Sequence, residues 1–505
     1  MNRFSFFLLF ACATMVTCTP SEAQNAPRPA AKRKTKGETK AKGERIREAW
    51  YAFEFAGNKI GYIKAIDERT SVNGRPAYHL HRWSKLTVKR REEVVDIEST
   101  TDSWFSVDGA PMRFKHSRSE GAESRSIDGY RDGDVFVLRQ SVGQNLTEKK
   151  IPFSPDLRLS SSLEVLLADN LKVGAQMKGR VIDESQADVL PFTASVASVD
   201  SAKVYTVKQQ VGPINAVVKM AADGTIIDVA LPDMGVRQKK VSEQEAVRMT
   251  ETVDLFSAAL FKMPRPLPPR DDIEQLIVRL SSKQGRQAKA VIDDRQSSKM
   301  RGKDAMLTIK VQRAPSRKLS RPVSGAKWQR FLSSTEYEPL DDERLRATAE
   351  RLVDGKKTVW SAARAINAFV YKHIGNKSLA RAYASAPEAL ATGEGDCTEH
   401  AVLFSALAKI AGIPTRLVTG LVYVGGAENV FGYHEWVEIW SGDQWLAMDP
   451  TFGQDVADAT HIKLHAGLSD AEGLRAAGQV AAGAIGDLNV EVVAYIDSTG
   501  KRREL

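Results

Sequence analysis

The sequence predicts an α+β protein in which an N-terminal antiparallel all-β domain is followed by a mixed α+β domain. Short turn signals recur through residues 48–262, with alternating apolar and polar runs between them. A proline-rich break follows at 264–269, where neither a helix nor a central strand can continue. Helical periodicity begins near Leu340. At 505 residues the chain is too long for one ordinary core, which also predicts more than one domain.

Residues 1–23 have the pattern of a secretory signal peptide. Arg3 supplies a positive start, an apolar run at 4–16 is too short to span a bilayer, and Ser21-Glu22-Ala23 is a small-x-small cleavage site. Lipid attachment at Cys18 is an alternative, but a bacterial attachment site resembles a small residue directly before the cysteine, which this chain lacks. We therefore predict export to the periplasm or the medium, with no transmembrane segment in the mature protein.

The predicted linker at 24–47 carries much of the basic charge of a chain whose formal net charge is +9. Its cationic residues are Lys32, Arg33, Lys34, Lys36, Lys40, Lys42, Arg45 and Arg47. The simplest interpretation is a solvated, disordered tether. Loose attraction to an anionic cell envelope is the functional alternative. Nucleic acid is not an expected partner, because the chain is predicted to be exported and no aromatic residues interleave with these charges.

Residues 48–262 predict a meander or curved sheet with one face covered. The turn signals are Gly57-Asn58, Asn73-Gly74, Asp108-Gly109, Asp128-Gly129 and Asp223-Gly224. Two histidines, His79 and His81, are interpreted as strand residues, because their spacing does not predict a metal site. Whether this domain binds a ligand or positions the rest of the chain stays open.

Residues 263–330 predict a small β connector, and residues 471–505 a C-terminal tail with a final strand. In the connector, 275–280 and 305–311 are the expected strands, and the basic stretch between them is expected to be an exposed loop. Two helices should follow. Asp341-Asp342 caps the first, which ends at Val353, and the second runs from about 358 to 374.

Cys397 is the only cysteine outside residues 1–23, and it opens a predicted helix. Asp396 is a good N-cap, Glu399 completes a capping box, and Gly412 ends the helix. At the first helical position, unpaired backbone N–H groups and the helix dipole favour a thiolate and can hold an oxyanion. A buried structural cysteine is the alternative.

A later hairpin is predicted to bring a histidine and an aspartate together. With a two-residue loop at Ser441-Gly442, Trp440 faces Asp443, and the same register places His434 opposite Asp449. Directly opposed residues share one face of a sheet, so Asp449 would fix the tautomer of the imidazole. A one-residue slip would separate them.

These residues form a candidate nucleophilic site with Cys397 as nucleophile, His434 as base and Asp449 as orienting group. His400 is a competing base, three residues after Cys397 on the same helix. It ranks second because no carboxylate is evidently placed behind it. We predict neither a cofactor nor a metal.

Four blocks of sequence resemble the transglutaminase-like superfamily, which shares the papain-like thiol fold. They are Gly395-Asp396-Cys397-Thr398-Glu399-His400-Ala401, Ala411-Gly412-Ile413-Pro414-Thr415-Arg416, His434-Glu435-Trp436-Val437-Glu438 and Trp445-Leu446-Ala447-Met448-Asp449-Pro450-Thr451. The resemblance implies a catalytic domain at 331–470 with a papain-like α+β fold. It also implies that Cys397 attacks an amide carbonyl, that a thioester forms, and that an amine or water releases it.

The leading functional hypothesis is therefore an exported thiol enzyme that acts on protein or peptide amide bonds, with hydrolysis or deamidation favoured. An amine-accepting, cross-linking transglutaminase is the second hypothesis. A non-catalytic envelope protein that uses the same domain for binding or assembly is the third. Calcium dependence is not expected, because no acidic loop resembles a calcium site.

Overall fold

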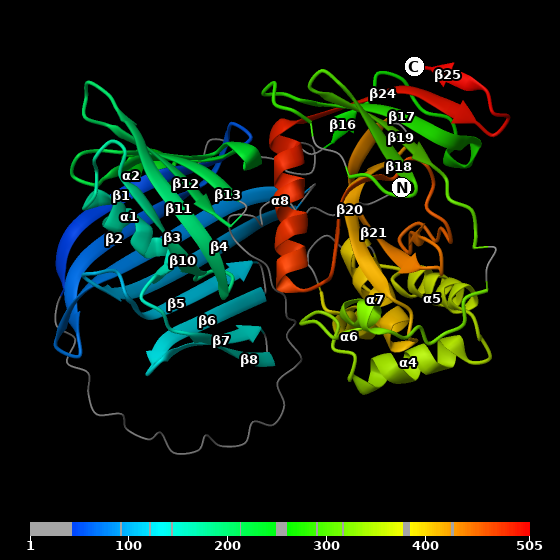
Figure 1. The fold of residues 1–505 in the computed structure, drawn as a ribbon, viewed down its shortest axis with the longest axis horizontal. Coiled ribbons are helices and arrows are strands. Elements are labelled where there is room, and N and C mark those ends of the chain that lie inside the picture. The colour runs from blue at the N-terminus through cyan, green and yellow to red at the C-terminus, as the bar shows by residue number, and fades with distance from the viewer. Residues whose placement is uncertain are drawn as a thin grey trace. The chain divides into compact units, whose positions relative to one another are not determined.

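The computed structural model describes residues 43–90, 93–120, 123–142, 145–212, 214–248, 260–288, 291–315, 318–376, 384–425 and 429–505. The predicted signal peptide, Cys18 and the charged run up to residue 42 lie outside these residues. The chain divides into two compact units, Val16–Val88 with Val94–Val253 and, as the main part of the other, Asp254–Leu505. Each unit is described by itself below (Figure 1).

The first unit is built around one 15-stranded sheet. Its strands are β1 (Glu44–Phe55), β2 (Asn58–Val72), β3 (Arg75–Arg90), β4 (Glu93–Ser106), β5 (Pro111–Glu120), β6 (Glu123–Asp132), β7 (Val135–Val142), β8 (Asn145–Pro152), β9 (Leu157–Leu159), β10 (Gln176–Asp183), β11 (Asp188–Val199), β12 (Tyr205–Val211), β13 (Ile214–Met220), β14 (Ile226–Leu231) and β15 (Val236–Val241). Its short helices are α1 (Leu163–Ala168) and α2 (Glu243–Val247), with single turns η1 (Ser160–Ser162) and η2 (Pro232–Met234).

This sheet curves until its two ends share a core. Strands adjacent in the sheet are adjacent in the sequence, except where β1 pairs with β15. Side chains of β3 to β8 pack with Leu157, Leu159 and Ile182 of β9 and β10 in one hydrophobic cluster. Most strands pair antiparallel, as β1 does with β2, but β9 and β10 run parallel. The predicted antiparallel all-β domain is thus confirmed in part, since the parallel pair and the helices α1 and α2 were not predicted.

One of the predicted turns is wrong. Asp128-Gly129 lies inside β6, and the chain turns instead at Gly133, whose φ is +58°. Gly129 is needed within the strand because a Cβ there would lie 2.0 Å from the ring of Phe114. The glycine therefore marks close packing of an aromatic ring and not a change of direction.

The first strand begins earlier than the sequence suggests. β1 starts at Glu44, inside the range predicted as a linker, and pairs with β2. In this register Arg45 lies opposite Glu68, and Arg47 lies opposite Asp67. Opposite charges in facing positions stabilise a strand pair. Polar residues that resemble a tether by composition therefore extend the sheet.

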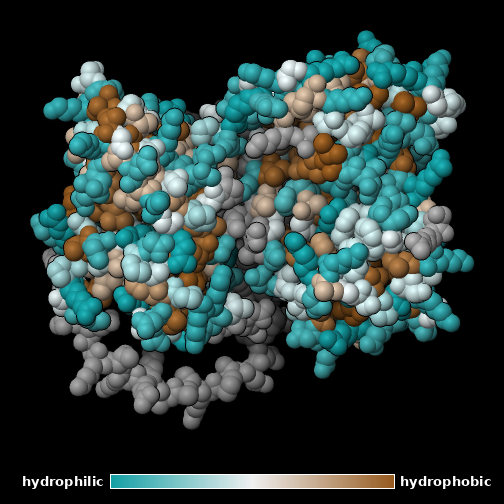
Figure 2. All heavy atoms as spheres, in the orientation of Figure 1, coloured by the Kyte–Doolittle hydropathy of each residue, from teal (hydrophilic) through white to brown (hydrophobic). Residues whose placement is uncertain are grey.

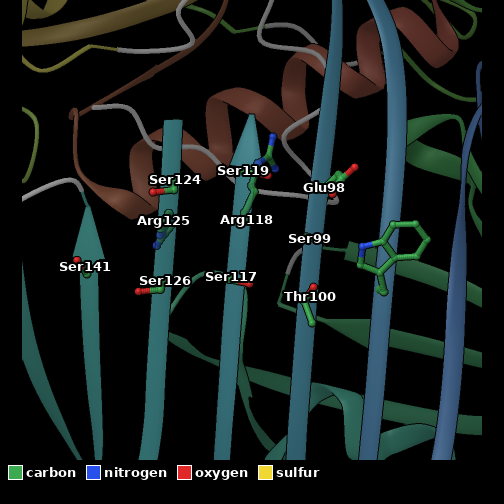
Figure 3. Close-up of a pocket in the computed structure, with 11 residues that line it drawn as sticks. Glu98, Ser99, Thr100, Ser117, Arg118, Ser119, Ser124, Arg125, Ser126 and Ser141 are labelled. Carbon is green, nitrogen blue, oxygen red and sulfur yellow. The ribbon is translucent and has the colours of Figure 1, made fainter. Parts of the chain in front are cut away.

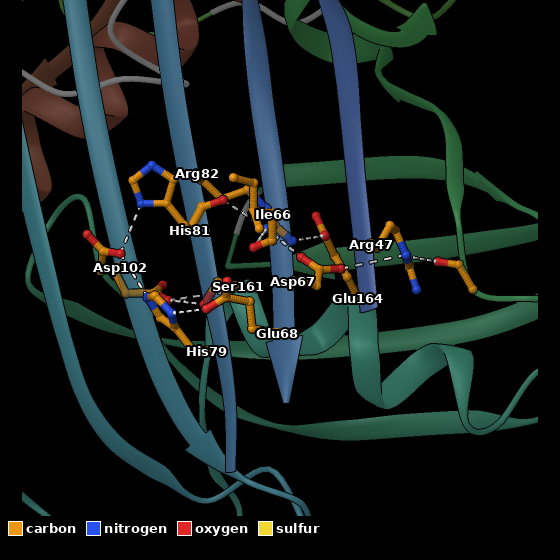
Figure 4. A network of polar contacts seen from close by, with 12 residues as sticks. Arg47, Ile66, Asp67, Glu68, His79, His81, Arg82, Asp102, Ser161 and Glu164 are labelled. Atoms are coloured by element: carbon orange, nitrogen blue, oxygen red, sulfur yellow. Dashed lines mark hydrogen bonds and ion pairs between the residues drawn. The ribbon is translucent and has the colours of Figure 1, made fainter. Parts of the chain in front are cut away.

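A polar network crosses β2, β3 and β4 (Figure 4). His79 Nε2 and His81 Nδ1 lie 2.8 and 2.9 Å from the same Asp102 oxygen, and Trp104 stacks on His79 with ring centroids 4.5 Å apart. Burial alone would lower the pKa of His79, but its hydrogen bonds to Asp102 and Glu68 raise it. The two histidines thus belong to an ion-paired ladder between strands.

Small hydroxyl side chains leave a hollow of about 370 Å³ on this sheet, across β4 to β7 (Figure 3). Ser117, Ser119, Ser124 and Ser126 line it, and Trp83 of β3 borders it. Hydrophilic residues predominate on the visible faces of both units, where hydrophobic residues show in small groups (Figure 2).

The second unit contains two smaller sheets and five helices among its described residues. Its strands are β16 (Phe261–Lys262), β17 (Ile273–Ser282), β18 (Gln296–Arg301), β19 (Asp304–Lys310), β20 (Thr415–Tyr423), β21 (Val430–Trp440), β22 (Trp445–Met448), β23 (Ile462–Gly467), β24 (Leu488–Asp497) and β25 (Arg502–Glu504). Its helices are α4 (Glu343–Val353), α5 (Val359–His373), α6 (Ala386–Thr392), α7 (Cys397–Ile410) and α8 (Ala471–Asp487), with single-turn or 3₁₀ segments η3 (Arg270–Asp272) and η4 (Ala326–Phe331).

The predicted connector and the predicted C-terminal tail share one sheet, ordered β18-β19-β17-β24-β25. The two expected connector strands are present as β17 and β19. The exposed loop expected between them is wrong at its end, where β18 forms and both Arg295 and Gln296 are buried. These two polar side chains are buried because they bond to backbone carbonyls of the segment before β23 and at its start.

Helix caps explain why two helices match their predicted bounds closely. Asp342 accepts hydrogen bonds from Arg344 N and Leu345 N at the start of α4, and Thr358 accepts one from Ser361 N at the start of α5. The helices α6 and α8 were not predicted. In the part of the chain that the structure describes, no helix combines the length and apolar character needed to cross a bilayer.

A buried ion pair fixes α7 within the second unit. Lys409 contacts Glu338, and their side chains are 1% and 0% exposed. We expect Lys409→Met to destabilise the protein by about 3–5 kcal/mol, because it leaves a carboxylate buried without its cation. Urea unfolding followed by tryptophan fluorescence measures the change, and the double variant with Glu338→Gln should recover part of it.

The control for this prediction is the exposed pair Arg279–Glu491 of the same unit. Arg279→Met should change stability far less, since water solvates the remaining carboxylate. Equal losses for the two single variants would contradict the prediction.

Candidate active site

Local sequence places Cys397 at the start of α7. The Asp396 side chain accepts a hydrogen bond from Thr398 N at 2.7 Å, and Glu399 Oε2 accepts one from Asp396 N at 2.8 Å. The predicted capping box is confirmed. Gly395 makes room for it, because its φ is +150° and a Cβ there would lie 2.4 Å from Glu399 Cβ. Cys397 is 2% exposed.

The hairpin that carries the other two residues has a longer loop than predicted. Trp440 pairs with Trp445, and Ser441 N donates to Gln444 O at 3.0 Å. The predicted pairing of Trp440 with Asp443 is therefore wrong by two residues. Because side chains alternate between faces with a period of two, this shift leaves His434 and Asp449 on the same face.

His434 and Asp449 are in contact. His434 Nε2 lies 2.8 Å from Asp449 Oδ2, and both side chains are fully buried. The other oxygen, Asp449 Oδ1, accepts hydrogen bonds from the backbone N–H groups of Thr451 and Phe452. The Phe452 ring stacks on His434 with centroids 4.9 Å apart. The imidazole is thus held at one nitrogen and along one face.

Cys397 lies beside the same strand. The backbone N–H of Glu435, the residue after His434, donates a hydrogen bond to the Cys397 thiol. The first turn of α7 therefore meets β21 at the residue that follows His434. The competing base His400 is placed differently, since its Nδ1 contacts the backbone carbonyl of Asp396 within its own helix.

Burial controls the electrostatics of this group. It raises the pKa of the Cys397 thiol well above its usual value, and the nearby carboxylates of Asp396 and Glu435 raise it further. Burial also lowers the pKa of His434, although Asp449 opposes this. The predicted lowering of the thiol pKa at the helix N-terminus is therefore wrong, because desolvation raises that pKa. Both pKa shifts favour the uncharged form of the group, the thiol of Cys397 and the imidazole of His434.

This electrostatic balance predicts that the Cys397 thiol reacts slowly with alkylating reagents at neutral pH. A raised pKa means a smaller thiolate fraction at any given pH, so alkylation of Cys397 by iodoacetamide should still be accelerating above pH 8.5. Mass-mapped alkylation rates from pH 6 to 10 measure this, with unfolded protein in urea as the control. Fast labelling below pH 7 would contradict it.

The sequence did not predict a second imidazole on the same carboxylate. His461 Nε2 lies 2.9 Å from Asp449 Oδ2, and its Nδ1 lies 3.2 Å from Asp458 Oδ1. The only signal was the polar run Asp458-Ala459-Thr460-His461 shortly after Asp449, which resembles an ordinary turn.

The ligand atoms of His434, Asp449 and His461 lie within 4.8 Å of one another. Both imidazoles contact one carboxylate oxygen at hydrogen-bonding distance, so we interpret the three residues as a hydrogen-bonded network and not as metal ligands.

The part of the chain that carries this site is similar to a known protein family. Residues 346–450 match the model of the Transglutaminase-like superfamily. A protein-glutamine gamma-glutamyltransferase of Pseudomonas aeruginosa is 38% identical over 71 residues, a match that covers 12% of this chain and 10% of the relative.

Two solved structures are also similar. A candidate cysteine protease from Cytophaga hutchinsonii is 17% identical, with 46% of this chain and 88% of that chain covered and a TM-score of 0.30. A beta-barrel-like protein of a domain of unknown function from Brucella abortus is 10% identical, with 39% of this chain and 95% of that chain covered and a TM-score of 0.29.

Proposed function

Because the chain contains a domain of the transglutaminase-like superfamily, we propose that it is a thiol enzyme acting on amide bonds of proteins or peptides. Cys397 is the nucleophile, His434 the general base and Asp449 the orienting group. The observation that carries this proposal is the buried 2.8 Å contact of His434 Nε2 with Asp449 Oδ2, together with the hydrogen bond between the Cys397 thiol and the backbone of Glu435, the residue after His434. A papain-like arrangement, with a thiol-bearing helix packed on an antiparallel sheet, fits the same domain.

The proposed reaction begins with a proton transfer. His434 Nε2 faces Asp449, so Nδ1 is the nitrogen that takes the thiol proton as sulfur attacks the amide carbonyl carbon. Backbone N–H groups of the first turn of α7 stabilise the oxyanion. The C–N bond then breaks, His434 returns the proton to the leaving nitrogen, and a thioester remains.

Water or an amine then attacks the thioester carbonyl carbon and gives a proton to His434, the C–S bond breaks, and His434 passes that proton to the leaving sulfur of Cys397. We favour water, which makes the enzyme a hydrolase or deamidase. The amine route is the second proposal and corresponds to protein cross-linking. Export, with residues 1–23 as signal peptide, remains part of this proposal, and loose attraction of the basic residues before β1 to the cell envelope is its alternative to a plain linker. So do the domain limits, with catalysis assigned to 331–470.

One observation favours a non-catalytic alternative. Cys397 is almost fully buried and its thiol pKa is raised, as in an inert structural cysteine. In that case the domain serves as a binding or assembly module, and its thiol neither reacts with amides nor forms a thioester.

The purified full-length chain tests these proposals with dimethylcasein as glutamine donor and biotinylated pentylamine as amine. Ammonia release with glutamine converted to glutamate supports hydrolysis, and amine adducts on glutamine support cross-linking. Casein without glutamate formation and without amine adducts, together with a Cys397 that does not react in a mass-mapped thiol-probe experiment, would support the binding or assembly module instead.

A further inference from the structure

Asp449 makes more hydrogen bonds than the proposed reaction requires. Its Oδ2 contacts both His434 and His461, at 2.8 and 2.9 Å, and its Oδ1 accepts two backbone N–H groups. All three side chains are fully buried. A carboxylate that only orients His434 has no need of a second imidazole.

The geometry of His461 indicates its protonation state. Its Nε2 faces Asp449, and its Nδ1 faces Asp458 Oδ1 at 3.2 Å. A neutral imidazole carries one N–H, so both contacts are hydrogen bonds only when both nitrogens are protonated. Asp458 Oδ1 also accepts the N–H and the hydroxyl of Thr460, which fixes this carboxylate as an acceptor. His461 thus sits between two anions as an imidazolium.

The connector holds His461 in this position. The buried Arg295 donates to the carbonyls of His461 and Asp458, at 2.9 and 2.7 Å. Gln296 donates to Lys463 O at 2.8 Å and accepts from Lys463 N at 3.0 Å. These two residues lie more than 160 positions before the segment that they hold.

A glycine on the neighbouring strand permits the same placement. Gly420 of β20 pairs with Lys463, and a Cβ at Gly420 would lie 2.0 Å from Ile462 O. The close approach of β23 therefore depends on the missing side chain. His461, directly before β23, is brought to Asp449 by this approach.

We propose that His461 is a positively charged positioning residue of the active site, which fixes Asp449 and leaves His434 neutral and ready to accept the thiol proton. The inference rests on the proposed function, because it needs Cys397 and His434 as the reacting pair. Without a cation on Asp449 Oδ2, the buried anion beside His434 would raise the pKa of His434 and so lower the fraction of His434 that is neutral and able to accept the thiol proton.

The surrounding charges agree with this role. Asp458 and Asp449 face His461, Arg295 lies behind its backbone, and Arg270 acts on His434 from the segment before β17. On the thiol side stand Asp396, the N-cap of α7, together with Glu399 of α7 and Glu435 of β21. Burial would lower the pKa of His461, but the two carboxylates outweigh it and raise that pKa. Burial, His461 and Arg270 together lower the pKa of His434.

Histidine-selective ¹⁵N NMR of the full chain tests the proposal without any substrate. In the unmodified protein we expect the His461 ring to carry protons on both nitrogens at a pH at which the His434 ring is neutral. A neutral His461 ring at that pH would overturn the proposal, whatever the variants do.

His461→Gln should then raise the pH at which His434 titrates by about one to two units, because Asp449 keeps its charge and the cation is gone. The acid limb of the pH–rate profile should move by the same amount, with kcat lowered and KM unchanged. Asp458→Asn is a second variant that should shift His434 in the same direction, should His461→Gln fail to fold.

The matched control is His465→Gln, the same chemical change at a histidine of β23, which is not among the hydrogen-bond partners of Asp449 in the described part of the chain. It should leave the His434 titration in place. If His461→Gln and Asp458→Asn lower the rate but leave that titration unmoved, His461 only packs and the proposal is overturned. Turnover that survives Cys397→Ala would defeat the proposed function instead, and the NMR titration would still decide the role of His461.

Discussion

Replacing Cys397 with Ala is expected to abolish amide turnover while the protein stays folded. The sulfur forms the bond to the substrate, and His400, three residues later in the same helix, cannot replace it because its Nδ1 contacts the Asp396 carbonyl. Loss of a nucleophile of this kind costs about 10⁴–10⁶-fold in kcat. Stability should change little, since Ala keeps the capped helix start and removes one buried polar atom.

Ammonia release and amine incorporation measure this loss, and circular dichroism with urea unfolding checks the fold. Cys397→Ser is the matched control for shape, because it keeps the volume and a hydroxyl but lacks the nucleophilicity of sulfur. It should be nearly as inactive as the Ala variant. A rate in Cys397→Ala close to that of the parent protein would mean that another group attacks the amide.

Asp449→Asn is expected to reduce the rate by about 10⁴-fold, the effect of losing tautomer control in a comparable triad. An amide at this position can donate to His434 Nε2 and so stabilise the wrong tautomer, whose proton lies on Nδ1. It also leaves the His461 imidazolium without one of its two carboxylates. The rate should therefore fall through the base and not through substrate binding, with KM nearly constant.

The control is Asp443→Asn, the same change in the exposed turn of the same hairpin. It should leave kcat unchanged and alter only the local bond to Ser441. Asp449→Asn should additionally unfold at lower urea concentration than Asp443→Asn, because a buried charged network loses a partner. Equal rates in the two variants would show that some other group orients His434.

Local chemistry explains why the helix with the thiol was predictable. Asp396 and Glu399 close a capping box within four residues, and the helix ends before Gly412, whose φ is +73°. Such signals act over one turn, so the sequence contains them in full. The turns at Asn73-Gly74 and Asp223-Gly224 were predictable for the same reason.

The hairpin was predicted with the correct face but the wrong register, because its register depends only in part on neighbouring residues. The strands on either side of Ser441 were expected, but the loop closes through Ser441 and Gln444. Loop length depends on which hydrogen bonds the folded sheet can complete, and a two-residue loop was only one choice. This error did not separate His434 from Asp449, because the register differs by two residues and side chains alternate between faces with a period of two.

The sequence by itself determined the capped thiol, the order of nucleophile, base and carboxylate, and the strand-rich character of the first unit, since each depends on neighbours within a few residues. The tertiary structure alone decided that His461 joins Asp449, that Arg295 and Gln296 of the connector hold it there, and that burial raises the pKa of the Cys397 thiol. These last properties come from contacts between distant segments and from the removal of water on folding. A short stretch of sequence specifies neither the contacts nor the loss of water.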